Sequence, residues 1–218
     1  MPISRSEAKE LAQKTERVRA EYYPYWRFRY AYSDDSGERR RRMPWMPYHQ
    51  ILAGVLQSGR RLLAFDKARQ MQITWDICAF LLHNAMVRQS TEIVALSKNQ
   101  RDSEYLVFRI KTLWNNQPQF LRDAWPMYPT EDELFFPRSL CRIVALPAGE
   151  EPVRGYQGNL FFLDECGHMD GFMDRFTAAI PQISRPTNPG RIIMAGTPNI
   201  HGDWWRVVKD KIDDRVRA

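Results

Sequence analysis

The sequence predicts an α/β fold built on a largely parallel β-sheet with helices on both faces. From residue 61 onward, segments with strand patterns alternate with segments of helical periodicity, and the predicted strands are uniformly apolar. Hydrophobic residues make up 44% of the 218-residue chain, which is enough for one core. Because ligands of such sheets bind beyond the carboxyl ends of the strands, a functional site is expected there.

The first part of the chain, residues 1–43, is predicted to form a helical and aromatic arm. Ser4 and Glu7 have the spacing of a capping box, at the start of a helix that ends before Pro24. In residues 22–32, aromatic residues alternate with arginine, which indicates a short extended segment. These aromatic residues either pack the arm onto the body or stack on bases.

Residues 44–218 are predicted to form the α/β domain. Helices are expected over residues 47–57, 73–85, 102–114, 171–180 and 203–212. Strands are expected over residues 61–65, 92–96, 134–136, 140–146, 160–163 and 191–195. The segment 115–133 is rich in Pro, Trp and Asn, and is expected to be irregular.

The net charge and the cysteine content limit the kinds of partner and the cellular compartment that the chain is expected to have. The formal net charge of +6 and the arginine run at residues 39–42 favour an anionic partner such as nucleic acid, or reflect a solvated basic surface. Cys78, Cys141 and Cys166 form no CxxC pair, so neither a disulfide framework nor a zinc site is predicted, and a reducing compartment fits. No apolar stretch approaches the roughly 20 residues that cross a bilayer, so no membrane partner is expected.

A polar loop, DKARQMQIT, connects a predicted strand to a predicted helix. Such a loop offers backbone N–H groups and the positive end of the helix dipole to a phosphate. Thr74 stands where a magnesium-binding hydroxyl is expected, but Gln72 and Ile73 replace the glycine and lysine of the usual GxxxxGK[ST] motif. Lys67 and Arg69 could reach bound phosphates. The alternative is an ordinary connection between a strand and a helix.

Two adjacent carboxylates, Asp164 and Glu165, follow the apolar strand at 160–163. Such a pair is costly unless a cation or a substrate proton balances it. We interpret Asp164 as a ligand of Mg²⁺ and Glu165 as the base that orients and deprotonates an attacking water. A further apolar strand ends in GTPN at 196–199, which either senses a γ-phosphate or forms a plain turn.

In their order and spacing, KARQMQIT, VRGYQGNLFFLDE and MAGTPN resemble the ATPase half of the large terminase subunit of tailed bacteriophages, the motor that packages DNA into procapsids. The resemblance covers residues 45–205 and implies a P-loop NTPase fold of the ASCE type. It implies Mg²⁺ with ATP, and double-stranded DNA, the portal protein and the small terminase subunit as partners. It also implies a homo-oligomeric ring on the procapsid in the host cell cytoplasm. Full-length large subunits continue into a nuclease domain, and no nuclease activity is expected from these residues.

The resemblance also implies roles for individual residues. The nucleotide-binding set consists of a glutamine that reads adenine and the deviant phosphate loop: Gln50, Lys67, Ala68, Arg69, Gln70, Met71, Gln72, Ile73 and Thr74. The expected catalytic residues are Glu165 and Arg69, with Arg69 acting on the γ-phosphate, and the metal-binding residues are Thr74 and Asp164. The coupling motif, which links hydrolysis to movement, is Gly196, Thr197 and Pro198, and an RG pair precedes the acidic strand at Arg154 and Gly155.

Two rival hypotheses remain open at this stage. A helicase-like DNA-remodelling ATPase would share the fold, but such enzymes normally show the intact GK[ST] loop and a second motor domain. A non-catalytic DNA-binding or assembly scaffold would use the same fold with a dead nucleotide pocket, marked by Gln72 and Ile73. Measuring nucleotide binding separates the scaffold from the enzyme.

Overall fold

A seven-stranded sheet forms the centre of the structure, a computed structural model that describes residues 4–33, 41–44, 46–131, 133–147, 156, 158–184 and 190–197. In spatial order its strands are β3 (Leu62–Asp66), β9 (Arg191–Gly196), β8 (Leu160–Leu163), β4 (Glu92–Ser97), β7 (Cys141–Pro147), β6 (Glu133–Phe136) and β5 (Tyr128–Pro129). The strands from β3 to β7 are parallel, while β6 and β5 continue the sheet antiparallel. The prediction of a largely parallel sheet is confirmed.

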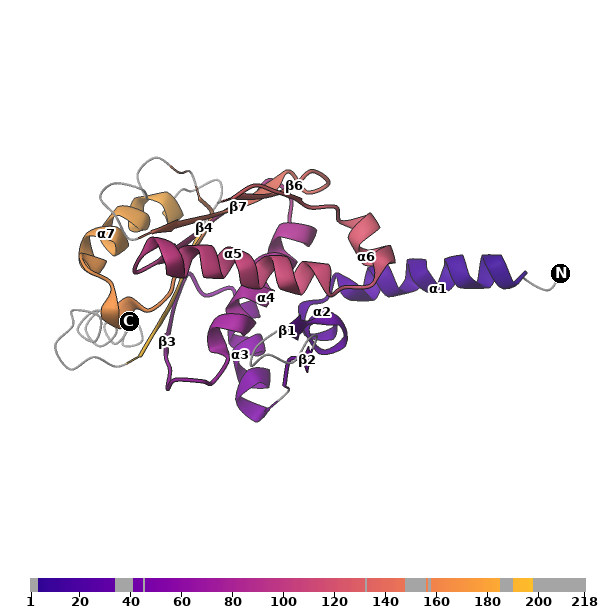
Figure 1. The fold of residues 1–218 in the computed structure, drawn as a ribbon, viewed down its shortest axis with the longest axis horizontal. Coiled ribbons are helices and arrows are strands. Elements are labelled where there is room, and N and C mark those ends of the chain that lie inside the picture. Colours follow the sequence, from indigo (N-terminus) through magenta and orange to yellow (C-terminus); the bar gives the residue numbers. More distant parts are fainter. Residues whose placement is uncertain are drawn as a thin grey trace.

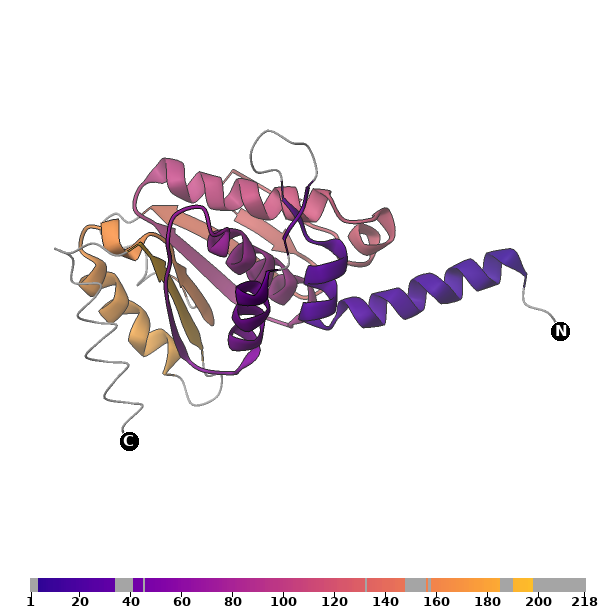
Figure 2. The same cartoon turned by 90° about the horizontal axis from the view of Figure 1, so that it is seen from below.

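Helices cover both faces of this sheet. On one side lie α3 (Pro47–Gln57), α4 (Ile73–Val87) and α5 (Gln100–Asn115), and on the other lies α7 (Phe172–Ile183), as Figures 1 and 2 show. Along β4, Ile93 and Ala95 belong to the core beneath α4 and α5, whereas Val94 and Leu96 belong to the core beneath α7. Because both faces are covered, the strands are apolar throughout, as the sequence predicted.

Helix α4, which follows the polar loop, is buried on all sides. Every residue from Ile73 to Met86 is buried, including the polar Thr74, Asp76, His83 and Asn84. A helix that is apolar all round is typical of the inside of a protein rather than of its surface. The amino-terminal end of α4 is therefore held firmly where the loop enters it.

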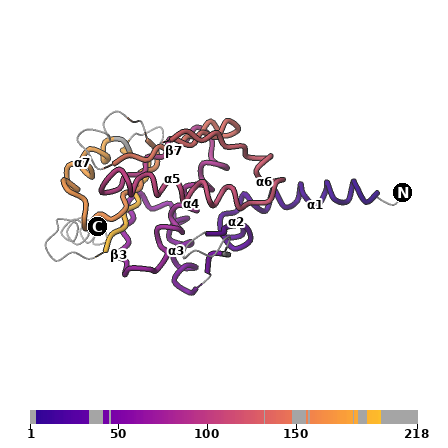
Figure 3. Tube along the Cα trace, in the orientation of Figure 1, coloured from indigo at the N-terminus to yellow at the C-terminus, as the bar shows by residue number. Residues whose placement is uncertain are grey.

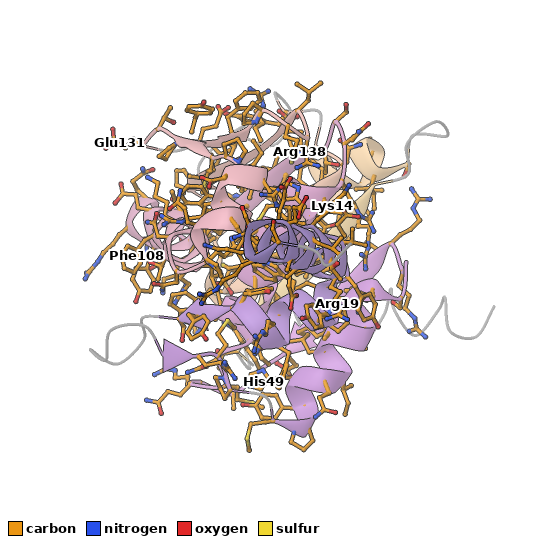
Figure 4. The ribbon with its side chains drawn as sticks, turned by 90° about the vertical axis from the view of Figure 1, so that its right-hand side faces the viewer. Lys14, Arg19, His49, Phe108, Glu131 and Arg138 are labelled. Atoms are coloured by element: carbon orange, nitrogen blue, oxygen red, sulfur yellow. The ribbon has the colours of Figure 1, made fainter. Side chains whose placement is uncertain are left out.

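The amino-terminal helix leads away from the body of the molecule. Helix α1 (Arg5–Ala20) begins with the predicted capping box between Ser4 and Glu7, and it extends from the body as Figures 1 and 3 show. Figure 4 shows the molecule from this end, with Lys14 and Arg19 on the projecting helix.

The prediction of an extended segment at 22–32 is wrong, because residues Tyr23–Tyr30 form helix α2. Pro24 is accommodated in its first turn, where a missing N–H costs nothing. Tyr23, Trp26 and Tyr30 share the buried face, so helical spacing prevails over the alternation of aromatic residues and arginine. For Tyr23, Trp26 and Tyr30, the interpretation that the aromatic residues pack the arm onto the body is confirmed, whereas Tyr22 and Phe28 are exposed.

Two further predictions differ from the structure. Residues 115–133 are not irregular throughout, because α6 (Gln119–Ala124) forms after Pro118 and buries Leu121, and β5 joins the sheet. Within the arginine run at 39–42, which was interpreted as a solvated basic surface or a contact for an anionic partner, β2 (Arg41–Arg42) pairs antiparallel with β1 (Tyr32–Ser33). Residues 39–40 and the helix predicted at 203–212 lie outside the described residues.

The structure also bears on the predictions about disulfides and about membrane-spanning segments. All three cysteines are buried and free, which agrees with the expectation of no disulfide framework. Within these residues, the structure contains no helix whose length and hydropathy would let it cross a bilayer.

Candidate functional site

Lys67 lies at the centre of a buried polar cluster. Its Nζ donates to Thr74 Oγ1 at 2.8 Å, to Glu165 Oε1 at 3.0 Å and to Asp164 Oδ1 at 3.2 Å. Thr74 Oγ1 in turn donates to Asp164 Oδ1 at 3.2 Å. Residues that are more than ninety positions apart in the chain thus form one hydrogen-bonded group, as the sequence predicted for the loop and the acidic pair.

The sheet topology brings these residues together. Strand β9 pairs with both β3 and β8, and all of these strands run parallel, so their carboxyl ends meet at one edge. The Lys67 N–H donates to Gly196 O at 3.0 Å, and the Asp164 N–H donates to Leu96 O at 2.9 Å. These backbone bonds extend the ladder by one residue beyond the strands, which fixes both side chains at the start of their loops.

The charges of the cluster do not balance. Burial raises the pKa of Asp164 above its ordinary value, and the attraction of Lys67 opposes this effect only in part. For Lys67, burial acts to lower the pKa, but Asp164 and Glu165 outweigh it, so its pKa lies above the usual range. Within the cluster, two carboxylates share one ammonium group.

Backbone conformation around the cluster is unusual. Gln70, Gln72 and Glu165 all have positive φ, at 65°, 56° and 55°. Residues other than glycine adopt this left-handed region at a cost of roughly 1–2 kcal/mol each, and such residues are concentrated at functional sites. Gln72 occupies the N-cap of α4 without a side-chain capping bond, and its Oε1 is buried without a hydrogen-bond partner.

The cluster forms the floor of a cavity of about 490 Å³. The polar loop lines it from Lys67 to Thr74, together with Asp164 and Glu165. Thr197, at the end of β9, also lines it. Every residue predicted to bind nucleotide except Gln50 therefore faces this space.

Other predicted site residues lie elsewhere. Gln50 is exposed on α3 and does not line the cavity, so its role in reading adenine stays a prediction. Gly196 is the last residue of β9 and accepts the Lys67 N–H, but it does not line the cavity. Pro198, Arg154 and Gly155 lie outside the described residues.

The oxygen ligands present fit a magnesium nucleotide better than a metal held by protein alone. Thr74 and Asp164 present a hydroxyl and a carboxylate, which suit Mg²⁺, and this ion usually completes its coordination with water and phosphate oxygens. Within the described residues there is no group of three or more His, Cys, Asp or Glu side chains that could hold a metal ion.

The cavity also contains residues that the sequence analysis missed. They come from the first turn of α4, from the end of β4 and the helix after it, and from the turn after Glu165: Trp75, Ser97, Lys98, Asp102, Tyr105, Arg109 and His168. The rule that ligands bind at the carboxyl ends of parallel strands could have identified Ser97 and Lys98. Arg109 lies well inside α5, where no local sequence signal distinguishes it.

A second buried carboxylate lies in the first turn of α4. Asp76 Oδ1 accepts from Arg27 Nε at 2.5 Å, and Asp76 Oδ2 is hydrogen-bonded to His49 Nδ1. The Tyr23 hydroxyl donates to the backbone carbonyl of Asp76 at 3.1 Å. These partners come from α2 and α3, so the network ties the amino-terminal arm to the helix that begins at the cavity.

The fold is shared with phage large terminases. The sequence matches no protein-family model and no curated protein. The HK97 bacteriophage large terminase is similar in structure, with a TM-score of 0.69 and 19% identity over 91% of this chain and 41% of that chain.

Two further solved structures are similar. The large terminase ATPase domain of Thermus phage P74-26 gives a TM-score of 0.61 and 13% identity, over 75% of this chain and 68% of that chain. The large terminase of another thermophilic bacteriophage gives a TM-score of 0.65 and 10% identity, over 79% of this chain and 44% of that chain. The chain spans less than half the length of the first and the last of these three proteins. At the level of fold, the predicted resemblance to the terminase ATPase domain is confirmed.

Proposed function

We propose that this chain is the ATP-hydrolysing motor domain of a viral DNA-packaging terminase and that it drives double-stranded DNA into procapsids. One observation carries the proposal: Lys67, Thr74, Asp164 and Glu165 converge on one cavity, in hydrogen-bonding contact with one another. An ordinary connection between a strand and a helix has no need of this buried, charge-unbalanced group. The likeness in fold to terminases supports the same function.

Different residues of the cavity would bind the phosphates and the metal ion. The backbone N–H groups of the loop and the ammonium of Lys67 would hold the phosphates, with exposed Arg69 reaching the γ-phosphate. Thr74 and Asp164 would hold Mg²⁺ that enters with ATP. When bound, this ion would neutralise charge on the β- and γ-phosphates.

Glu165 is the proposed general base. Its carboxylate accepts a hydrogen bond from Lys67, and its side chain is 28% exposed while that of Asp164 is 6% exposed, so Glu165 has better access to water. Phosphate oxygens would offer the Lys67 ammonium new partners, and its release from Glu165 Oε1 would leave that oxygen free to accept a proton from water. Glu165 also has a left-handed backbone conformation, and local strain of this kind is concentrated at functional sites.

The wider assembly belongs to the same proposal. The partners would be double-stranded DNA, the portal protein and the small terminase subunit, in a homo-oligomeric ring docked on the procapsid in the host cell cytoplasm. The net charge of +6 supports an anionic partner. We further propose that residues 1–43 act as an arm of the ATPase domain, with Gln50 near the adenine base. Gly196, Thr197 and Pro198 would couple hydrolysis to movement.

ATPase turnover of Glu165→Gln and Lys67→Ala tests the proposal. Glu165→Gln should lower turnover by at least about 100-fold while ATP still binds, because only the proton acceptor is lost. Lys67→Ala should weaken both ATP binding and turnover. The matched control is Glu104→Gln, an exposed carboxylate on α5 that does not line the cavity.

Three outcomes contradict parts of this interpretation. If both variants turn over ATP like the parent, the site is wrong. If the parent binds no nucleotide, the chain is a scaffold with a degenerate pocket, for which the unpartnered side chain of Gln72 in the loop is the supporting observation. If ATP hydrolysis is accompanied by unwinding of duplex DNA, the helicase-like alternative is favoured.

A further inference from the structure

Arg109 is a positively charged side chain in the cavity to which the proposed catalytic set gives no role. It lies on α5 and lines the cavity together with the phosphate loop. Its Nε is buried and has no hydrogen-bond partner. A buried N–H without a partner is rare in proteins and costs about 1–3 kcal/mol, so this one calls for an explanation.

Aromatic rings hold the Arg109 guanidinium in place. Its Cζ lies 4.2 Å from the ring centroid of Tyr105, one turn earlier on α5, and 5.7 Å from that of Trp75. Trp75 is 2% exposed and directly follows Thr74, so this contact joins α5 to the start of α4. Stacking of this kind fixes the guanidinium while leaving its N–H groups free to bind.

Two neighbours of Arg109 already have partners of their own. Phe108 stacks on Tyr105 with ring centroids 5.5 Å apart and points outward, as Figure 4 shows. Lys98 also lines the cavity, but it already pairs with Asp102 at 3.2 Å. Within the described residues, no ion pair or hydrogen bond neutralises Arg109.

Arg109 lines the cavity together with the carboxylates of Asp164 and Glu165. The positive charge of Arg109 acts on the buried carboxyl of Asp164, where it opposes the effect of burial on the pKa. Arg109 lines the same cavity as Thr74, Asp164 and Glu165, so a triphosphate whose metal lay at Thr74 and Asp164 would share this cavity with the guanidinium. An arginine here could bind a phosphate through paired N–H groups, which a lysine cannot reproduce.

We propose that Arg109 is a catalytic arginine supplied by this chain itself, which contacts the terminal phosphate of bound ATP and makes the site distinguish ATP from ADP. The inference rests on the proposed ATPase function and deepens it. Arg69 lies in the loop and is exposed, whereas Arg109 reaches the cavity from another helix and is held by Tyr105 and Trp75. Interaction with the charge that builds up on the transferred phosphate would be strongest in the transition state.

The test compares Arg109→Ala with Arg109→Lys and with Arg101→Ala, an exposed arginine on the same helix that does not line the cavity. We expect Arg109→Ala to lower kcat by about 10² to 10³-fold, with Arg109→Lys restoring little of it. Affinity for a non-hydrolysable ATP analogue should fall while affinity for ADP stays within about twofold of the parent, and Arg101→Ala should match the parent throughout. A merely structural role would change both affinities together.

Several results would overturn the inference. If Arg109→Ala keeps parental kcat while Glu165→Gln loses it, the role of Arg109 is wrong and the ATPase function stands. If affinities for the analogue and for ADP fall equally, Arg109 supports the fold instead. If Arg109→Ala does not fold, Tyr105→Leu replaces it in the test, because this variant keeps the charge of Arg109 and removes one of the two rings that stack on its guanidinium. An unchanged kcat in Tyr105→Leu would contradict the proposal that Tyr105 positions Arg109. If the parent neither binds nor hydrolyses ATP, both proposals fall.

Discussion

The structure contains two buried aspartates near the start of α4, and they differ in the partners of their carboxylates. Asp76 lies in the first turn of α4, and Asp164 contacts that turn through Thr74. Asp76 uses both carboxylate oxygens, one toward Arg27 and one toward His49, and its side chain is 3% exposed. Asp164 receives Lys67 and Thr74 on the same oxygen and faces the cavity. The Asp76 carboxylate is satisfied within the fold, although Nε2 of its partner His49 is buried without a hydrogen-bond partner. We call this group the closed network, and the group around Asp164, which faces the cavity, the open network.

This difference separates a structural carboxylate from a functional one. In the closed network two basic side chains surround one carboxylate, and the guanidinium of Arg27 also donates to the carbonyls of Met43 and Pro44. In the open network two carboxylates surround one ammonium. Burial alone therefore does not identify a site, because the side chains of Asp76 and Asp164 are buried to similar extents. The number of acidic and basic side chains in each network distinguishes them: Asp76 is one carboxylate between two basic side chains, whereas Asp164 and Glu165 share Lys67.

Removing Asp76 should have the largest effect on stability. Asp76→Ala leaves Arg27 and His49 buried without their partner, and we expect it to lower the free energy of unfolding by about 3–5 kcal/mol. Urea-induced unfolding monitored by circular dichroism measures this change. A loss below about 1 kcal/mol would show that the closed network contributes little, and the comparison with Asp164 would then fail.

The matched control for Asp76→Ala is an exposed aspartate. Asp123 lies on the surface of α6, where its Oδ1 accepts from Gln119 Nε2 at 2.6 Å. Asp123→Ala should change the free energy of unfolding by less than about 0.5 kcal/mol, as surface substitutions usually do. An equal loss in both variants would point to a general effect of removing negative charge from a basic protein.

Neutralising Asp164 should have a smaller effect and the opposite sign. Asp164→Asn removes a buried negative charge, and Lys67 still has Glu165 as an ion-pair partner. We therefore expect the free energy of unfolding at pH 7 to rise by about 1 kcal/mol. Because the folded-state pKa of Asp164 is raised, ionisation costs stability as pH rises from about 4 through that pKa. The variant should lose this part of the pH dependence, and unfolding curves from about pH 4 to 7 test it. A variant destabilised by more than about 2 kcal/mol would mean that the Lys67 pair is structural.

The part of the fold that the sequence predicts is the part built from regular patterns. Uniformly apolar runs located strands β8 and β4 closely, and turn and capping residues located α1 and α3. The extended conformation predicted for residues 22–32 is wrong because residues 23–30 satisfy alternation and helical spacing at once. Only the buried contacts of Trp26 and Arg27 decide between the two patterns. Such a choice depends on tertiary partners that a local pattern does not contain.

The candidate site divides in the same way. Lys67, Thr74 and Asp164 could be selected because each stands at the end of a predicted strand or the start of a predicted helix, and parallel strands bring such ends together. Arg109 and Asp76 have no such distinguishing signal. Arg109 lies between the inward-facing Leu106 and Ile110 on an ordinary amphipathic helix, and its place in the cavity depends on the packing of α5 against α4.

The smallest expected effect concerns the loop position that departs most from the usual motif. Gln72 holds a left-handed conformation that glycine adopts at little cost, and its buried side-chain oxygen has no partner. We expect Gln72→Gly to raise the free energy of unfolding by up to about 1 kcal/mol, and to strengthen ATP binding several-fold because the loop N–H groups become more accessible. Thermal unfolding and nucleotide titration measure the two effects.

Gln70→Gly is the control for Gln72→Gly, since Gln70 has a similar φ of 65° but an exposed side chain. Gln70→Gly should relieve backbone strain without the gain that comes from removing a buried side-chain oxygen that has no partner, so its effect on ATP affinity should be smaller. If Gln72→Gly instead weakens ATP binding, the glutamine contacts the nucleotide and is a working part of this loop. A further outcome is that the parent binds no ATP and Gln72→Gly does. In that case the Gln72 side chain blocks the pocket, and the open network around Asp164 can bind a nucleotide once this side chain is removed.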